Sequence, residues 1–288
     1  MHFSGKEAND SDLTVVDLTT ASFKKLEPLD ISIYGYILDM ALVAQNRLLL
    51  CTYNKLVLVD SQQDKVKFEL NLMNQPGRVC IINKDCAAVK TSTYDNEKLQ
   101  YMHYIKIKDD TLKPGERVRV SVSGCIKGIC AMKDNLAVSY VYPPAVAIIT
   151  KKGKVINRIG NDTAEREIFI SPWYLTASSD YEHIFVSDHG TNTITMLNPD
   201  LQVLNTFSNQ RLLNSTHGLS MWNDQVLVCG GASNNIVLLD PSSGRMSTIL
   251  DEKDGIDRPG FLAFCHQTKT LFITPFFRND NIQPYQLQ

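Results

Sequence analysis

The chain has 288 residues, of which 43% are hydrophobic and 21% are charged, and its formal net charge is −2. This composition is typical of a soluble globular protein, and the mildly acidic balance disfavours the uniformly basic surface of a DNA-binding protein. No apolar signal-peptide core follows Met1, and nowhere do about 18 apolar residues run together, so we expect neither secretion nor a membrane span but a cytoplasmic protein.

The seven cysteines are odd in number, scattered, and mostly set in apolar runs such as residues 48–51 and 226–229. Free cysteine behaves as a small buried hydrophobic residue in such surroundings. No Cys-x-x-Cys pair and no Cys/His cluster with zinc spacing occurs. We therefore expect no metal and no cofactor.

An internal repeat lies in the second half of the chain, where residues 184–199 resemble residues 226–241. Each unit is a β-branched run, a short polar loop and a second apolar run that ends at a proline, which predicts a β-hairpin. Four residues recur 42 positions later: Asn192, Ile194, Leu197 and Pro199 return as Asn234, Ile236, Leu239 and Pro241. Four short strands in each such unit are typical of a propeller blade.

In chain order, the blades are predicted to open near residues 38, 77, 128, 173, 218 and 260. The long second blade carries a polar insertion at 91–98, which we expect to be a loop. Only three strands fit after Gly260, so the fourth strand of the last blade must come from residues 13–18 or 21–26. The sequence thus predicts an all-β, six-bladed β-propeller over residues 12–288, with four antiparallel strands per blade and the last blade closed by an N-terminal strand, preceded by a flexible segment at 1–11.

The hairpin at 186–194 resembles NHL repeats, with Asp188, a loop containing Asn192, and an apolar strand. The segments 135–144, 184–190 and 253–259 are similar to the C-terminal domain of tripartite-motif (TRIM) proteins of the invertebrate type, over roughly blades three to six. In that family a RING, a B-box and a coiled coil precede the propeller, and the whole protein is an E3 ubiquitin ligase whose propeller selects the target. The resemblance implies a non-catalytic recognition domain that is monomeric alone and dimeric in a parent protein with a coiled coil.

Asp188 and Asn192 have two interpretations. Calcium-dependent propeller hydrolases place Asp, Asn and Glu around the central channel, which makes a hydrolase the remote alternative. Asp and Asn at these positions also satisfy backbone groups of turns, and this structural role is favoured. The predicted blade openings carry cationic or aromatic residues, which do not hold calcium, so we expect no catalysis.

The face that bears the loops between the second and third strands collects aromatic and cationic residues, which commonly anchor protein interfaces. His189 and His217 stand alone in sequence and are expected to contact a partner; Trp173, Tyr174 and Phe276 could instead pack between blades. The predicted partner-binding residues are Arg78, Lys127, Tyr140, Tyr142, Trp173, Tyr174, His189, His217, Arg258, Phe276, Phe277 and Arg278. We expect a protein partner; RNA is the alternative, although acidic residues interleave with Arg78, Lys98, Lys127, Arg258 and Arg278.

Overall fold

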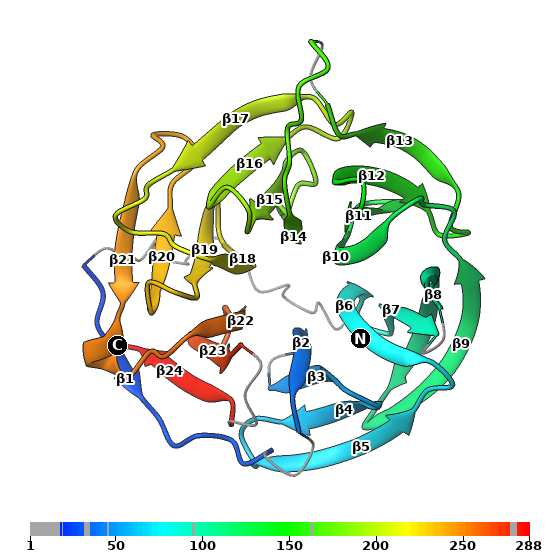
Figure 1. Cartoon of the computed structure of the whole chain (residues 1–288). Helices are drawn as coiled ribbons and strands as arrows, with labels where there is room; N and C mark the ends of the chain where they lie inside the picture. Colours follow the sequence, from blue (N-terminus) through cyan, green and yellow to red (C-terminus); the bar gives the residue numbers. More distant parts are fainter. Residues whose placement is uncertain are drawn as a thin grey trace, which may run out of the picture.

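In a computed structural model that describes residues 18, 20–31, 35–44, 46–93, 96–161, 164–276 and 281–288, with the side chains of 93 and 96–98 left aside, six four-stranded antiparallel sheets form a closed ring (Figure 1). The innermost strands β2, β6, β10, β14, β18 and β22 surround the central channel. The predicted six-bladed β-propeller is therefore confirmed. The expected flexible segment at 1–11 lies outside the described residues.

The strands succeed one another from the channel outward in each blade. Blade 1 consists of β2 (Ile37–Ala44), β3 (Arg47–Thr52), β4 (Lys55–Asp60) and β5 (Lys65–Asn71). Blade 2 consists of β6 (Gln75–Asn83), β7 (Cys86–Thr93), β8 (Asn96–Lys108) and β9 (Thr111–Arg119). Blade 3 consists of β10 (Cys125–Ala131), β11 (Asn135–Val141), β12 (Ala145–Thr150) and β13 (Val155–Ile159). Blade 4 consists of β14 (Pro172–Ala177), β15 (Ile184–Asp188), β16 (Thr193–Leu197) and β17 (Val203–Ser208).

Blade 5 consists of β18 (Thr216–Trp222), β19 (Gln225–Gly230), β20 (Asn235–Leu239) and β21 (Met246–Leu250). Blade 6 consists of β22 (Pro259–Cys265), β23 (Thr270–Pro275), β24 (Gln283–Leu287) and, outermost, β1 (Phe23–Lys25). A 3₁₀ turn, η2 (Glu252–Asp254), precedes this last blade. Within the described residues, no helix has the length and apolar character that a bilayer crossing requires.

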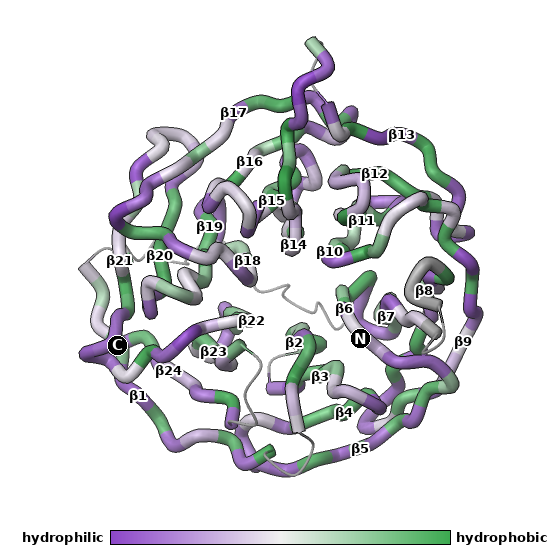
Figure 2. The backbone as a smooth tube through the Cα atoms, viewed as in Figure 1, coloured by the Kyte–Doolittle hydropathy of each residue, from purple (hydrophilic) through white to green (hydrophobic). Residues whose placement is uncertain are grey.

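The hydrophobic core is divided among the contacts between neighbouring blades. The second and third strands are buried on both faces, as in β3 and β4, and their apolar side chains pack against the next blade; one such layer joins Leu49 and Leu58 of blade 1 to Val89 and Ile105 of blade 2. Outer strands such as β13 and β17 are mostly exposed and combine hydrophilic with hydrophobic residues (Figure 2). Because no blade can bury its faces alone, the blades stabilise one another only as a closed ring.

The ring is closed by pairing of the two ends of the described chain. Phe23 pairs with Leu287 and Lys25 pairs with Tyr285 in antiparallel register. Of the two candidate segments, 21–26 thus supplies the fourth strand, whereas 13–17 lies outside the described residues. Closure covers the outer edge of β24, which would otherwise offer unpaired backbone groups to another chain.

The polar insertion of blade 2 does not form the expected loop. β7 and β8 extend beyond those of the other blades, with Ser92 paired to Gln100 and Thr93 paired to Asn96. The prediction of a loop at 91–98 is wrong because backbone pairing can continue through a polar sequence once two strands are already aligned, and threonine is readily accommodated in strands.

Asp188 organises the loop around β15. Its carboxylate is 1% exposed and accepts hydrogen bonds from the backbone N–H groups of Ile170 (2.7 Å), Ser171 (2.9 Å), Gly190 (2.8 Å) and Thr191 (3.3 Å). This confirms the structural role that the sequence favoured for this residue.

The repeated asparagines connect neighbouring blades. Asn192 Oδ1 accepts a hydrogen bond of 2.7 Å from the N–H of Ser215, and Asn234 Oδ1 accepts one of 2.9 Å from the N–H of Arg258. Both asparagines and both donor residues have positive φ, a conformation that asparagine tolerates better than most residues. The 42-residue repeat therefore preserves a contact that fixes where the next blade begins.

Candidate functional site

The innermost strands all begin on the same face of the ring, here called the upper face, which also carries the turns between second and third strands. Neighbouring innermost strands lie very close together: a Cβ added to Gly218 would stand 2.8 Å from the carbonyl oxygen of Gly260, and one added to Gly128 would stand 2.8 Å from that of Trp173. Glycine is required there because any side chain would strike the adjacent backbone.

Arg78 fills the middle of the channel. Its guanidinium donates hydrogen bonds to the backbone carbonyls of Leu38 and Lys127 and to the hydroxyl of Tyr174. The same group lies 4.7 Å from the ring centroid of Tyr174 and 5.4 Å from that of Phe261. Arg78 thereby joins blades 1, 2, 3, 4 and 6, and the cavity that it lines at the axis has a volume of about 70 Å³.

Asp39 is the acid beside this arginine. Its two carboxylate oxygens each accept a 2.9 Å hydrogen bond, one from the N–H of Met40 and one from the N–H of Val79. Burial raises the pKa of Asp39 to about 6, while the positive charge of Arg78 and the two hydrogen bonds act in the opposite direction. The carboxylate is thus ionised at neutral pH and offsets part of the charge of Arg78.

An aromatic–histidine cluster, defined as Trp173, His189, His217 and Phe276, lies on the upper face over blades 4 to 6. Trp173 stacks on His189 with ring centroids 4.7 Å apart, and Phe276 lies 4.1 Å from His217 and 5.8 Å from Trp173. Trp173, His189 and Phe276 are partly exposed, whereas His217 is only 2% exposed. Three rings therefore offer a rigid apolar surface to the solvent, supported by the fourth.

Ser215 joins the two histidines of this cluster. Its Oγ lies 3.0 Å from His189 Nε2 and 3.0 Å from His217 Nε2. A hydroxyl has one proton to donate, so it donates to one imidazole and accepts from the other, which fixes opposite tautomers for the pair. Burial lowers the pKa of His217 to about 3 and also lowers the pKa of His189. Both rings are accordingly neutral at pH 7, and the cluster carries no charge.

A serine beside a histidine is the first requirement for nucleophilic catalysis, and an acid on the far ring nitrogen is the second. Within the described residues the second is not met at His217, whose Nδ1 is buried without a hydrogen-bond partner. The same residues contain no group of three or more His, Cys, Asp or Glu side chains placed to hold a metal ion.

A basic pocket of about 440 Å³ adjoins the cluster where blades 1, 2 and 3 open on the upper face. Its cations are Arg78, Lys90 and Lys127, and two partly exposed tyrosines, Tyr36 and Tyr53, also line it. The ammonium of Lys127 lies 5.9 Å from the ring centroid of Trp173, so the basic pocket and the aromatic–histidine cluster are continuous.

The structure brings together Arg78, Lys127, Trp173, Tyr174, His189, His217 and Phe276 of the predicted partner-binding residues. Tyr174 is buried at the channel, where it supports Arg78. Tyr142 is 85% exposed and Arg258 is exposed, both on the upper face.

The placement of Tyr140 at the rim is wrong. Tyr140 is 1% exposed and packs into the core between blades 2 and 3, with its hydroxyl accepting a hydrogen bond from Arg158. A strand that is buried on both faces turns even its last aromatic residue inward. Phe277 and Arg278, and the side chain of Lys98, lie outside the described residues.

Four residues of the site were not predicted from the sequence: Tyr36, Tyr53, Lys90 and Ser215. Ser215 directly precedes β18 and His217 lies within it, and this separation of two residues could have suggested their contact. His189 meets Ser215 and His217 only across the boundary between blades 4 and 5, and no local sequence pattern reports such contacts.

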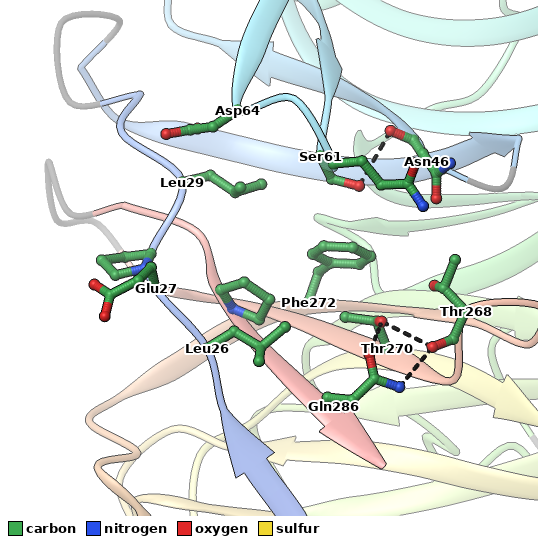
Figure 3. Close-up of a pocket in the computed structure, with 13 residues that line it drawn as sticks. Leu26, Glu27, Leu29, Asn46, Ser61, Asp64, Thr268, Thr270, Phe272 and Gln286 are labelled. Atoms are coloured by element: carbon green, nitrogen blue, oxygen red, sulfur yellow. Dashed lines mark hydrogen bonds between the residues drawn. The ribbon is translucent and has the colours of Figure 1, made fainter. Parts of the chain in front are cut away.

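A second cavity, of about 360 Å³, lies on the opposite face at the seam between blades 1 and 6 (Figure 3). Some of its polar side chains bond to other groups of the same cavity: Ser61 Oγ donates to the carbonyl of Asn46, and the Gln286 amide donates to the carbonyl of Thr268. Gln286 also accepts a hydrogen bond from Thr270 Oγ1. These hydrogen bonds lie within blade 1 and within blade 6, and none of them crosses the seam.

No protein-family profile matches the chain, and no curated protein is similar to it in sequence. Solved structures share its fold. A protein of unknown function from Bacteroides thetaiotaomicron is 13% identical with a TM-score of 0.69 and covers 88% of this chain and 70% of its own. One of unknown function from Bacteroides caccae is 15% identical with a TM-score of 0.60, over 82% and 85%. The β-propeller domain of Cps50 (Swd1) from Myceliophteria thermophila is 14% identical with a TM-score of 0.60, over 88% and 83%.

The chain is a β-propeller domain. At these identities the likeness establishes the fold alone, and function must be argued from the upper face.

Proposed function

We propose that this propeller is a protein-recognition domain that binds a peptide segment of its partner on the upper face. The observation that carries the proposal is the aromatic–histidine cluster, in which Trp173, His189 and Phe276 hold one another in fixed positions while remaining partly exposed. Rigid aromatic surfaces bind with little loss of side-chain freedom and are frequent interface anchors.

The test is selection of random peptides on the immobilised chain, followed by measurement of the affinity of the selected peptides for variants. Trp173→Ala and Phe276→Ala should each weaken binding about tenfold or more, as truncation of an anchor does. Ile156→Ala is the matched control, because Ile156 is an exposed apolar side chain on the outer strand of blade 3. Equal affinity in all three variants, with unchanged thermal stability, would refute the cluster as the binding surface.

The finer proposal is that this domain selects substrates for a TRIM-type ubiquitin ligase in the cytoplasm. It is supported by the NHL-like hairpin of blade 4, and the free state of all seven cysteines is compatible with a reducing compartment. Loss of the gene should lengthen the half-life of the protein that carries the selected peptide sequence. An unchanged half-life would refute the ligase role and leave peptide binding intact.

RNA binding is the second candidate, favoured by the three cations and two tyrosines of the basic pocket. Binding to single-stranded RNA should weaken steeply as salt is added, because counterions are released from the phosphates. A flat salt response, or no binding at low salt, would remove this candidate.

A further inference from the structure

The basic pocket has an excess of positive charge. Arg78, Lys90 and Lys127 line it, and no carboxylate is among its described lining residues. Asp39, the acid beside Arg78, faces the channel and offsets part of the charge of Arg78. A net positive cavity with low-dielectric walls concentrates anions.

The three cationic side chains of the pocket differ in how deeply they are buried and in how firmly they are held. Lys90 is 8% exposed and stands below Gly77, where an added Cβ would meet its side chain at 3.4 Å. Arg78 is held by backbone carbonyls, so its charge is fixed in place. Lys127 is half-buried, and within the part of the chain that the structure describes it forms no salt bridge. Two fixed cations therefore form the floor of the pocket, and one adaptable cation lies at the side toward Trp173.

The walls of the pocket suit a side chain with an apolar body. Tyr36 and Tyr53 are partly exposed at its rim, and Leu38, Pro76 and Ile126 also line it. A volume of about 440 Å³ exceeds the needs of a bare inorganic ion and lies in the range of pockets for organic groups.

We propose that the basic pocket binds an anionic side chain of the peptide, a carboxylate or a phosphate monoester, while a neighbouring apolar side chain lies on the aromatic–histidine cluster. Because Lys127 belongs to the pocket and also approaches Trp173, the two side chains should be only a few residues apart in an extended peptide. This inference rests on the proposed peptide binding and specifies its chemistry.

The charge distribution favours a peptide over RNA as the occupant. RNA would need cations repeated along a track for successive phosphates. Here three cations gather in one pocket, and the adjoining surface carries His189 and His217, which are neutral at pH 7. A single anion next to an apolar group matches that arrangement.

The first experiment titrates phenyl phosphate and phenylacetate into the whole chain and follows binding by NMR and calorimetry. Lys127→Gln should weaken binding about tenfold, as expected for one charge-assisted contact, and Lys133→Gln, an exposed lysine in the turn between β10 and β11, should leave it unchanged. Lys127 is partly exposed, so its replacement should not impair folding; equal thermal stability checks this. No binding of either compound to the wild type, or equal binding to both variants, overturns the anion pocket.

The second experiment uses the selected peptides, each synthesised with its anionic residue and with the neutral counterpart, Asp against Asn and phosphoserine against serine. The neutral form of each peptide should bind the wild type about tenfold more weakly than the anionic form, and this difference should become smaller in Lys127→Gln, where Arg78 and Lys90 remain. Should Trp173→Ala abolish peptide binding while the charge of the peptide has no effect, the proposed function stands and this inference fails. If phenyl phosphate binds but no peptide does, or if single-stranded RNA displaces it and peptides do not, the anionic peptide is the wrong occupant.

Discussion

Removing the carboxylate of Asp188 should cost the fold about 4 kcal/mol. Asp188→Ala leaves four backbone N–H groups without their acceptor. A hydrogen bond to a charged group contributes roughly 1.5–3 kcal/mol. The backbone nitrogens of Ile170 and Ser171 lie 2.7 and 2.9 Å from the two carboxylate oxygens of Asp188. The N–H groups of Gly190 and Thr191 instead lie on a loop that water can reach. The estimate of about 4 kcal/mol therefore counts mainly the hydrogen bonds from Ile170 and Ser171.

The magnitude can be measured by urea denaturation with tryptophan fluorescence and by calorimetry. For a chain of 288 residues, an unfolding entropy of about 2.1 cal/mol/K per residue converts 4 kcal/mol into a fall of about 7 °C in Tm. Asp188→Asn keeps the shape of the side chain but has one acceptor oxygen fewer, so it should lower the free energy of unfolding by about half as much. Asp224→Ala, at an exposed turn between β18 and β19, is the control and should change stability by less than about 0.5 kcal/mol.

A loss below about 1 kcal/mol for Asp188→Ala, or an Asp188→Asn variant as stable as the wild type, would refute the reasoning. In the first case the loop would have found other acceptors for its backbone groups. In the second case the charge of the carboxylate would make no contribution.

Three further changes follow from the fold. Asn192→Ala and Asn234→Ala should each lower the free energy of unfolding by about 2 kcal/mol, since each loses a hydrogen bond and places alanine at positive φ; glycine should recover about half, and identical effects of alanine and glycine in urea titrations would contradict the backbone contribution. The free energy of unfolding of the wild type, relative to that of Asp39→Asn, should fall by up to about 3 kcal/mol as the pH rises from about 4 to about 6. In this range Asp39 keeps its proton in the folded state, where its pKa is raised to about 6, but releases it in the unfolded state. A difference between the two proteins that does not vary with pH would refute this. Deleting residues 1–26 removes β1 and should cause concentration-dependent association in light scattering, together with a lower Tm; a monomeric truncated chain with unchanged Tm would show that β1 is dispensable.

The ring architecture could be predicted from the sequence because the same packing requirements recur from blade to blade. Glycine recurs where innermost strands crowd one another, as at Gly128 and Gly218, and asparagine recurs where one blade fixes the start of the next. These constraints act at a constant spacing along the chain. The extended hairpin of blade 2 was not predictable in this way, because a polar composition does not distinguish a loop from a polar pair of strands.

The candidate site was only partly predictable for a related physical reason. Aromatic and cationic residues at the blade openings identified Arg78, Lys127, Trp173 and His217. Whether such a residue faces solvent depends on the neighbouring blade, and this decides that Tyr140 is buried. A contact between blades 4 and 5 also brings His189 together with Ser215 and His217, and none of these residues alone predicts that grouping from the sequence.

The pairing that completes the ring also determines how the molecule responds to a pulling force. Phe23 lies opposite Leu287, and the N–H of Gln288 donates to the carbonyl of Ser22, so both ends of the described chain leave β1 and β24 at the same end of the strand pair. Tension applied between these ends loads one pair of residues at a time and opens β1 from β24 like a zipper, rather than shearing all their hydrogen bonds together. Under such a load we expect the β1–β24 seam to open first, and the blades to separate from blade 6 onward.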